Sequence, residues 1–238
     1  MNAPRLWAIV PAAGIGRRMG TDLPKQYLTL GDRTVLEHSL AALCILETLA
    51  GVVVALAEND PYWPGLAPEL PCPLFTAPGG AERAESVLHA LDVLRLHAAD
   101  DDWVLVHDAA RPCVRADDLR SLLTALHDDP VGGLLAVPVR DTMKQATDDQ
   151  RCAGTVDRRR LWHALTPQMF RLGMLHAALH TAQAAGAMVT DEASALEYAG
   201  YWPRLVEGHA DNLKITRPED LALAEFYLRQ QNRLMGRL

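Results

Sequence analysis

Residues 6–20 read LWAIVPAAGIGRRMG, an apolar run that ends in a loop of small residues and two arginines. The run Leu6–Val10 shows no polar alternation, which is typical of a parallel strand buried on both faces. The loop after it is rich in glycine and alanine, which lets backbone N–H groups approach a phosphate closely. The stretch therefore predicts a phosphate-binding loop after the first strand of a parallel sheet.

Further along the chain, short apolar runs alternate with segments whose apolar residues recur at helical spacing. We expect buried strands at Val52–Ala57, Trp103–Val106 and Leu134–Val139. We expect helices at Val35–Ala50, Ala81–Ala98 and Asp117–Leu126. Buried strands separated by helices indicate an α/β fold, here a Rossmann-like, mostly parallel sheet flanked by helices.

Two helix starts carry capping signals. Thr34 is followed three residues later by Glu37, which fits a capping box. Thr216 and Glu219 have the same spacing, with Pro218 in the first turn. The second signal predicts a final helix from Pro218 to about residue 234.

Two segments interrupt the alternation. The Pro61–Pro78 segment contains six prolines, which argue against a regular helix and predict an extended surface connection. Residues 140–160 are polar, and strand-like Thr142–Thr147 and Thr155–Val156 flank a turn, so we expect a β-hairpin arm. An arm with little core of its own needs a partner. We therefore expect one domain over residues 1–238, with 140–160 as the dimerisation arm of a homodimer.

Composition narrows the class of protein. The chain has 238 residues, 49% hydrophobic and 22% charged, with a formal net charge of −7. General nucleic-acid binding usually shows a basic surplus, so this balance argues against a nucleic-acid partner. The four cysteines are scattered without a C-x-x-C pair, which favours free thiols. The first apolar run is too short for a signal peptide or a membrane span, so we expect a cytoplasmic protein without a membrane partner.

Three alternatives compete for the glycine-rich loop. A dinucleotide fingerprint would need its third glycine one residue earlier and an acidic residue roughly 20 positions on. A P-loop would need the pattern G-x-x-x-x-G-K-[ST], which the loop lacks. A plain strand–helix turn is common, but Arg18 and Lys25 place cations beside the glycines, where they would stabilise charge on phosphate oxygens. We favour a triphosphate site.

Several ordered motifs resemble those of one enzyme family. PAAGIGRRM at 11–19, followed by PKQY at 24–27, is similar to nucleotidyltransferases that activate sugar phosphates. Five further segments resemble the 2-C-methyl-D-erythritol 4-phosphate cytidylyltransferase family: VHDAARP at 106–112, RDTMK at 140–144, LTPQ at 165–168, TDEAS at 190–194 and DNLKIT at 211–216. The resemblance implies transfer of CMP from CTP to 2-C-methyl-D-erythritol 4-phosphate. The products would be 4-diphosphocytidyl-2-C-methyl-D-erythritol and pyrophosphate, in non-mevalonate isoprenoid precursor synthesis.

Asp108 follows a predicted strand, at the sheet edge where ligands bind in open α/β folds. Its carboxylate suits Mg²⁺, which takes oxygen ligands and usually keeps waters and substrate phosphates. The resemblance implies that Asp108 and Asp211 bind Mg²⁺ or another divalent cation. Considered without the resemblance, Asp108 could equally cap a turn and Asp211 could be a surface residue.

The resemblance also assigns roles on the other motifs. Catalysis should come from positioning and charge neutralisation by Arg18, Lys25 and Lys214, because a phosphate monoester is already anionic and needs no strong base. The residues expected to bind the nucleotide are Ala12, Ala13, Gly14, Gly16, Gly80, Ser86 and Ala109. The residues expected to bind the polyol phosphate are Arg111, Thr142, Arg158, Thr166 and Thr190.

At some positions the roles known for the family cannot be transferred directly to this chain. Many members of the family have a polar or acidic residue where this chain has Ala81, so a side-chain contact to the base is missing there. The family's arm crosses to the partner subunit, so Thr142 and Arg158 would act in trans. His107, beside Asp108, could be mistaken for a catalytic base. This chemistry needs no base, so we expect His107 to be a structural histidine.

Other functions stay open on the residues alone. The same chemistry could use another acceptor, such as ribitol 5-phosphate. A catalytically silent nucleotide-binding protein would be expected to lack one of the charged residues, yet all are present. A Rossmann dehydrogenase is opposed by the displaced glycine and the missing ribose-binding acid.

Overall fold

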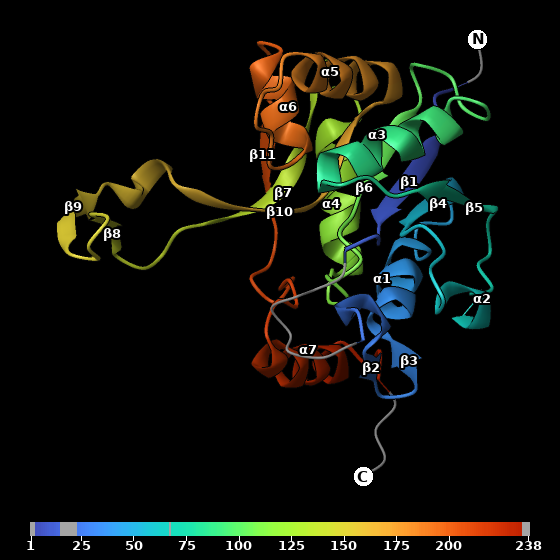
Figure 1. Cartoon of the computed structure of the whole chain (residues 1–238), viewed down its shortest axis with the longest axis horizontal. Helices are drawn as coiled ribbons and strands as arrows, with labels where there is room; N and C mark the ends of the chain where they lie inside the picture. The colour runs from blue at the N-terminus through green and yellow to red at the C-terminus, as the bar shows by residue number, and fades with distance from the viewer. Residues whose placement is uncertain (1–2, 15–22, 67, 235–238) are drawn as a thin grey trace.

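The computed structural model describes residues 3–14, 23–66 and 68–234. In chain order its elements are β1 (Leu6–Pro11), η2 (Lys25–Tyr27), β2 (Thr29–Leu30), β3 (Arg33–Thr34), α1 (Val35–Leu43), β4 (Leu49–Leu56), α2 (Trp63–Leu66), β5 (Leu74–Pro78), α3 (Arg83–Leu94), β6 (Trp103–Val106), α4 (Ala116–Leu126), β7 (Gly132–Pro138), β8 (Met143–Ala146), β9 (Cys152–Val156), η3 (Arg158–Arg160), β10 (Trp162–Arg171), α5 (Leu172–Ala184), α6 (Glu192–Tyr198), β11 (Arg204–Glu207) and α7 (Pro218–Gln230). Figure 1 shows how these elements surround a central sheet.

The central sheet has the strand order β11-β7-β10-β6-β1-β4-β5. Strands β6, β1, β4 and β5 run parallel to one another, and β11 is parallel to β7. Strand β10 lies between the two groups and is antiparallel to β6 and to β7. The expected α/β fold with a mostly parallel sheet is confirmed.

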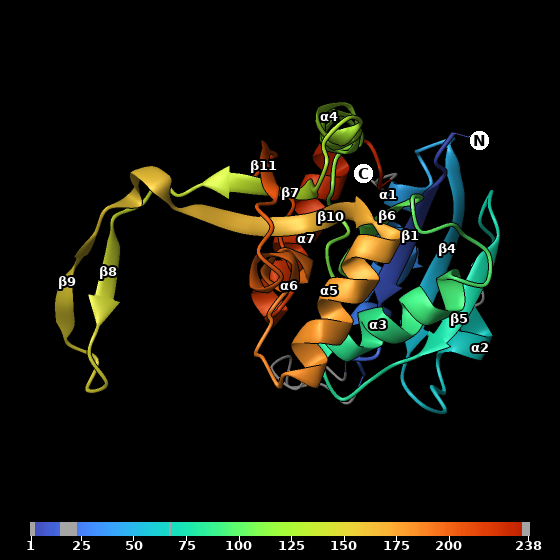
Figure 2. The same ribbon diagram turned by 90° about the horizontal axis from the view of Figure 1, so that it is seen from above.

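Both faces of the sheet are buried along β1, β4 and β6, which explains why these strands show no polar alternation. On β1, Ala8 and Val10 belong to the core cluster that includes residues of α1 and α4. Their neighbours Trp7 and Ile9 belong to the cluster that includes residues of α3 and α5. Figure 2 shows α4 on one side of the sheet and α3 and α5 on the other.

Helix α1 is shorter than predicted, because it ends at Leu43 and β4 already begins at Leu49. The apolar residues after Leu43 do continue at helical spacing. However, Leu46 N donates to the carbonyl of Leu43 in a turn, and Leu49 then joins the sheet. The prediction of a helix to residue 50 was wrong, since the same apolar residues serve the turn and the strand.

The proline-rich segment is not simply extended. It contains the short helix α2 and the strand β5, which lies at the edge of the central sheet. An edge strand tolerates proline, since one side of it makes no ladder hydrogen bonds. The carbonyl of Pro73, just before β5, accepts a hydrogen bond from the N–H of Val52 on β4. The prediction of a surface connection thus missed β5, one of the seven strands of the central sheet.

One predicted capping box is confirmed and the other is corrected. At α1, Glu37 N donates to Thr34 Oγ1 at 3.2 Å and Thr34 N donates to Glu37 Oε2 at 2.7 Å. At α7 the accepting carboxylate belongs to Asp220, whose Oδ2 receives the N–H groups of Thr216 and Arg217. Glu219 does not fill this role, because the helix begins at Pro218 and its third position is Asp220. Helix α7 ends at Gln230, short of the predicted end.

The segment between β7 and β10 projects from the body as a hairpin (Figures 1 and 2). Strands β8 and β9 pair antiparallel, with Met143 opposite Val156. All the residues of both strands are exposed or half-buried. In the part of the chain that the structure describes, no helix is long and apolar enough to cross a membrane.

Candidate active site

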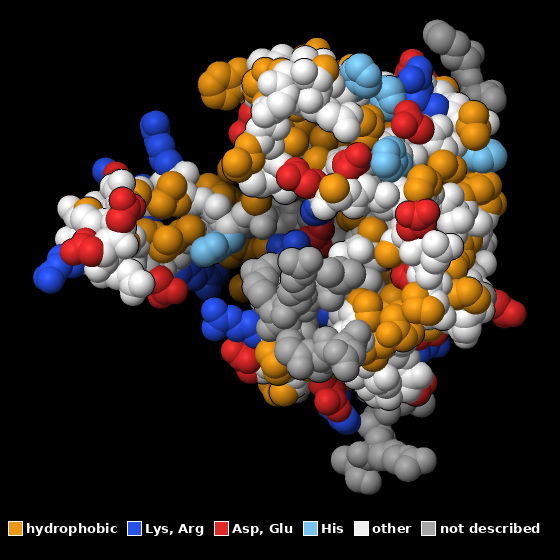
Figure 3. Space-filling view, viewed as in Figure 1, with side chains coloured by type: hydrophobic (Ala, Val, Ile, Leu, Met, Phe, Trp, Pro, Cys, Tyr) orange, Lys and Arg blue, Asp and Glu red, His pale blue; other side chains and the backbone are white. Residues whose placement is uncertain are grey.

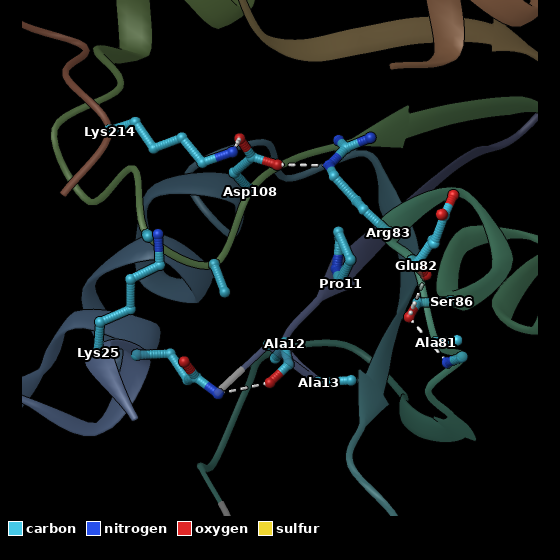
Figure 4. Close-up of a pocket in the computed structure, with 15 residues that line it drawn as sticks. Pro11, Ala12, Ala13, Lys25, Ala81, Glu82, Arg83, Ser86, Asp108 and Lys214 are labelled. Carbon is cyan, nitrogen blue, oxygen red and sulfur yellow. Dashed lines mark hydrogen bonds and ion pairs between the residues drawn. The ribbon is translucent and has the colours of Figure 1, made fainter. Parts of the chain in front are cut away.

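A cavity of about 580 Å³ opens at the carboxyl ends of three parallel strands. Its wall comes from the loops that follow β1, β5 and β6, which is where ligands bind in open α/β sheets. The lining residues are Pro11, Ala12, Ala13, Gly14, Lys25, Gln26, Gly80, Ala81, Glu82, Arg83, Ser86, Asp108, Ala109, Ala110 and Lys214. Figure 4 shows the two charged side chains Arg83 and Lys214 reaching Asp108 from different sides.

A smaller cavity of about 180 Å³ adjoins the first. Its lining residues are Arg83, Asp108, Arg111, Ala164, Leu165, Thr166, Gln168, Thr190, Asp191 and Lys214. Three residues line both cavities: Arg83, Asp108 and Lys214. This group, called the shared wall below, is therefore where two ligands bound in the two cavities would meet.

Asp108 is the anionic centre of the shared wall. Its Oδ1 accepts a hydrogen bond from Arg83 Nε at 2.8 Å, and its Oδ2 lies 2.8 Å from Lys214 Nζ and 3.5 Å from Arg111 Nε. Burial alone would raise the pKa of the Asp108 carboxyl, but the three cations hold this pKa well below its usual range. Asp108 is therefore ionised, and the cations around it outnumber it.

Lys214 reaches Asp108 because the segment before α7 runs along the loop after β6. Ile215 N donates to the carbonyl of Ala110, and Arg111 Nη1 donates to the carbonyl of Asn212. Asn212 Nδ2 in turn donates to the carbonyl of Thr166 on β10. These contacts join segments about a hundred residues apart in the sequence and place the ammonium group of Lys214 in both cavities.

Lys25 lies on η2, on the other side of the larger cavity, and its Nζ donates to the carbonyl of Ile215 at 2.9 Å. The neighbouring Gln26 is buried, and its Nε2 donates to the carbonyl of Ala12 at 2.6 Å. The sequence analysis did not single out Gln26. Its amide holds the backbone of Ala12, the first residue of the segment 12–14, called the small-residue loop below, which lines the cavity.

The loop after β5 is held by its own helix. Gly80 N donates to Ser86 Oγ at 2.9 Å, and Ser86 Oγ donates to the carbonyl of Glu82 at 3.1 Å. Gly79 lies against the small-residue loop, because a Cβ on Gly79 would stand 2.2 Å from Ala13 Cβ. The predicted nucleotide-binding residues that the structure describes thus come together on one side of the larger cavity.

His107 is buried behind the shared wall and has a structural role, as expected. Its Nε2 contacts the carbonyl of Arg111 at 2.9 Å and its Nδ1 contacts Thr166 Oγ1 at 3.0 Å, which assigns the proton to Nε2. The Thr166 hydroxyl also accepts the N–H of Asp108. Burial lowers the pKa of His107 to about 4, so the ring is neutral at pH 7. Thr166 lines the smaller cavity, but its hydroxyl is engaged in holding Asp108.

The remaining predicted residues are not all brought together. Arg111 and Thr190 line the smaller cavity, whereas Thr142 and Arg158 lie at the arm and line neither cavity in the described ranges. Arg158 Nη1 donates to the carbonyl of Arg140. The predicted residues Gly16 and Arg18 fall outside the residues that the structure describes.

Asp211 faces away from the shared wall. Its Oδ2 accepts from Arg115 Nε at 2.8 Å and from Gln231 Nε2 at 3.2 Å. Its buried Oδ1 has no hydrogen-bond partner among the described residues, and Asp211 lines neither cavity there. The two acidic residues expected to share a cation are therefore set in different surroundings.

The carboxylates of the site determine whether it can hold a divalent cation. Over residues 3–14, 23–66 and 68–234, no three His, Cys, Asp or Glu side chains converge on one point. Asp108 alone presents an ionised carboxylate to both cavities. A magnesium ion often has one or two carboxylate ligands and takes its others from phosphates and water. The described residues therefore fit a cation that arrives with a triphosphate.

Arg83 and Glu192 extend the cluster into the core. The guanidinium donates from Nη1 and Nη2 to the two carboxylate oxygens of Glu192, at 2.6 and 3.1 Å. Sequence reasoning missed Glu192, although it lies inside the TDEAS motif. The available signal was an acidic residue in the first turn of a short apolar helix, which more often faces solvent.

The family model described as 2-C-methyl-D-erythritol 4-phosphate cytidylyltransferase matches residues 6–230. The protein of that name from Pseudomonas entomophila is 61% identical over 219 residues, covering 92% of this chain and 93% of the relative. The one from Ectopseudomonas mendocina is 60% identical over 219 residues, with the same coverage.

A solved structure gives the same result for the fold. The crystal structure of the Francisella tularensis 2-C-methyl-D-erythritol 4-phosphate cytidylyltransferase superposes with a TM-score of 0.81 at 37% sequence identity. The superposition covers 94% of this chain and 100% of that chain.

Proposed function

The chain belongs to the 2-C-methyl-D-erythritol 4-phosphate cytidylyltransferase family, and from this premise we propose how its two cavities divide the reaction. As a nucleotidyltransferase of that family, it transfers CMP from CTP to 2-C-methyl-D-erythritol 4-phosphate. The products are 4-diphosphocytidyl-2-C-methyl-D-erythritol and pyrophosphate, in non-mevalonate isoprenoid precursor synthesis.

The observation that carries the proposal is the shared wall. We assign CTP to the cavity of about 580 Å³ and the smaller polyol phosphate to the cavity of about 180 Å³. An oxygen of the acceptor phosphate then attacks the α-phosphorus of CTP beside Arg83, Asp108 and Lys214. A new P–O bond forms while the bond between the α-phosphorus and the bridging oxygen breaks, and pyrophosphate leaves in line. The attacking oxygen is already anionic, so no proton has to be removed.

The nucleotide is held mainly by backbone groups in this proposal. Small residues leave room for the ribose and phosphates along the first loop, at Ala12, Ala13 and Gly14, and Gly16 follows them in the sequence. Beside this loop, Gly80 and Ser86, whose N–H and hydroxyl bond to each other, line the part of the cavity where we place the base, and Ala109 lines the same cavity. A slot bounded by a glycine loop that Ser86 holds in place favours a pyrimidine over the larger purines.

Catalysis in this proposal is electrostatic. Lys25 and Lys214 line the CTP cavity from two sides, and Arg18 follows the small-residue loop in the sequence. Charge that develops on the phosphate oxygens during transfer is stabilised by such preorganised cations. His107, the histidine beside Asp108, keeps both ring nitrogens occupied and is not poised as a base, which is consistent with a reaction that needs none.

Mg²⁺, or another divalent cation, is the cofactor we propose, with Asp108 as its ligand in the shared wall. Bound there with the triphosphate, such a cation neutralises charge on the phosphate oxygens. We keep Asp211 as the second candidate ligand because one oxygen of its buried carboxylate lacks a hydrogen-bond partner among the described residues. Its ion pair with Arg115 would have to open for that role.

The arm completes the acceptor site in a homodimer, in this proposal. Thr142 and Arg158 lie at the arm, while Arg111, Thr166 and Thr190 line the smaller cavity. Residues 140–160 carry six basic and four acidic residues, so the arm is positive whereas the whole chain has a net charge of −7. Figure 3 shows the arm clear of the body, with charged side chains around an apolar patch. Such a surface favours docking on a second copy, which brings Thr142 and Arg158 to the partner's cavity.

The location we propose is the cytoplasm. All four cysteines are free thiols, as expected in a reducing compartment, and neither nucleic acid nor membrane is expected as a partner.

The reaction is tested with purified protein, Mg²⁺ and each of the four ribonucleoside triphosphates, with 2-C-methyl-D-erythritol 4-phosphate or ribitol 5-phosphate as acceptor. Pyrophosphate and the nucleotide-linked product are both measured. We expect turnover with CTP and methylerythritol phosphate alone. Turnover with ribitol phosphate instead would keep the chemistry and overturn the acceptor. Binding of CTP without turnover would overturn the enzymatic function.

A further inference from the structure

Glu192 contacts Arg83 of the shared wall from the protein interior and has no exposed surface. It is the first residue of α6, and both of its carboxylate oxygens accept hydrogen bonds from Arg83. The third donor of that guanidinium, Nε, is directed to Asp108 at 2.8 Å. One planar group thus joins a buried carboxylate to the anionic centre of the site (Figure 4 shows the Arg83–Asp108 part).

The position of Glu192 is itself fixed by the sheet. Gln168 on β10 accepts the N–H of Ala193 at 2.8 Å and donates to Asp191 Oδ2 at 2.9 Å. The other oxygen of Asp191 caps α6 through the N–H of Ser194. The backbone on both sides of Glu192 is therefore held by the sheet, which gives Arg83 a fixed anchor in Glu192.

Stability alone gives little reason for this arrangement. Complete burial raises the pKa of the Glu192 carboxyl, and the ion pair with Arg83 acts against that shift. Buried ion pairs are often no more stabilising than apolar side chains of similar volume, so a buried pair is weak evidence for a stabilising role. Bidentate pairing does, however, fix the plane of a guanidinium.

We infer that Glu192 is a positioning residue for nucleotidyl transfer, which holds the Arg83 guanidinium against Asp108 and keeps it from moving onto the substrate phosphates. This inference rests on the proposed reaction at the shared wall. Lys214 contrasts with Arg83, because its side chain is 37% exposed and flexible. The arrangement leaves Lys214 as the cation that can pass from Asp108 to a phosphate, while Arg83 keeps the carboxylate in place.

The test compares Glu192→Gln with Glu192→Asp. Glutamine has the shape of glutamate but accepts only one of the two guanidinium hydrogen bonds, so Arg83 is released towards the phosphates. We expect kcat to fall by about 10- to 100-fold, the usual effect of removing a group that orients a site residue. We expect KM for CTP to stay the same or fall, since a released cation strengthens ground-state binding. Aspartate keeps the charge and should retain more kcat than glutamine, even if it destabilises the fold as much.

Asp102→Asn is the matched control. Asp102 is also a buried carboxylate, 3% exposed, with Arg5 and Trp7 as partners, but it precedes β6 and lies at the opposite end of that strand from Asp108. We expect this variant to lower the melting temperature and leave kcat and KM unchanged. Kinetics are measured well below the melting temperature of every variant, and circular dichroism checks that each is folded.

Each outcome decides the inference. A lower kcat in Glu192→Gln without a higher KM, with a smaller loss in Glu192→Asp and none in Asp102→Asn, supports positioning. An unchanged kcat in Glu192→Gln, or a loss that follows melting temperature across all three variants, means a structural role only and overturns it. If the unmodified protein releases no pyrophosphate from CTP, the proposed function fails first, and the inference fails with it.

Discussion

Lys25 Nζ donates a hydrogen bond to the carbonyl of Ile215, a residue 190 positions further along the chain. The contact connects η2, beside the small-residue loop, to the segment that carries Lys214. The two lysines on which the proposed mechanism relies are therefore part of one connected frame. The Lys25 ammonium group, fixed by this hydrogen bond, needs little reorganisation when charge develops on the phosphates.

Lys25→Ala should lower kcat by roughly two to three orders of magnitude, the scale for removing one transition-state donor. Pyrophosphate release at saturating CTP and acceptor measures the effect. Arg229→Ala is the control, since it removes an exposed cation on α7 that pairs with Glu225. A folded Lys25→Ala variant with unchanged kcat would remove Lys25 from the mechanism.

If the arm completes the partner's site, mixing two inactive variants should restore part of the activity. If Arg158 acts on the partner's cavity, a heterodimer of Lys25→Ala and Arg158→Ala subunits has one intact site. Random exchange of equal amounts should restore about one quarter of the activity, because about half of the dimers are mixed and each has one intact site of two.

Sedimentation measures the dimer in the same samples. A dimer without restored activity would show that Arg158 serves its own subunit or no site at all. A monomer that is active at nanomolar concentration would contradict the dimer proposal itself. Each single variant, exchanged with itself, gives the background activity.

The sequence was sufficient for β1, β4, β6 and β7, whose apolar runs predict strands, and insufficient for β5, β10 and β11. Apolar runs such as Trp103–Val106 have no polar residue, and each one forms a strand. Strand β10 contains His163, Thr166 and Gln168, whose polar side chains are explained by the site and by the arm. A strand that serves a site in this way lacks the apolar run by which strands are recognised.

Among the site residues too, some could be predicted from the sequence and others could not. Asp108 and Lys214 were found because the motifs around them resemble a known family, and they proved to be 2.8 Å apart. The part played by Glu192 could not be predicted, because an acidic residue in the first turn of a helix is usually solvated there. Its burial depends on Arg83, 109 positions away in the sequence. Local pattern carries no information on such a pairing.

Gly79→Ala should weaken CTP binding. The added Cβ would stand 2.2 Å from Ala13 Cβ and 2.9 Å from the carbonyl of Leu56, so the small-residue loop has to move. A displacement near 1 Å can lower catalysis by up to about 100-fold, and we expect kcat/KM for CTP to fall at least tenfold. Gly65→Ala is the control, since a Cβ there meets nothing within 4 Å. Equal kinetics for the two variants would show that the loop contact does not affect CTP.

Acid should destabilise the fold through His107. Burial lowers the pKa of this histidine to about 4 in the folded protein, whereas an unfolded chain has the ordinary value near 6.5. Between these two values the unfolded chain binds the proton and the folded protein does not, so the free energy of unfolding falls as the pH falls. From pH 7.5 to pH 5 the loss from this one residue should be about 2 kcal/mol. Urea unfolding at both pH values measures it.

His107→Gln isolates this contribution, because glutamine can accept from Thr166 but does not titrate. The quantity compared is the change in unfolding free energy between the two pH values, because this change is independent of the stability from which the variant starts. That change should be smaller than in the unmodified protein by about 2 kcal/mol. Burial also lowers the pKa of His38, which accounts for part of any loss that persists in the variant. An identical pH dependence in both proteins would mean that His107 is protonated in the folded state as readily as in water.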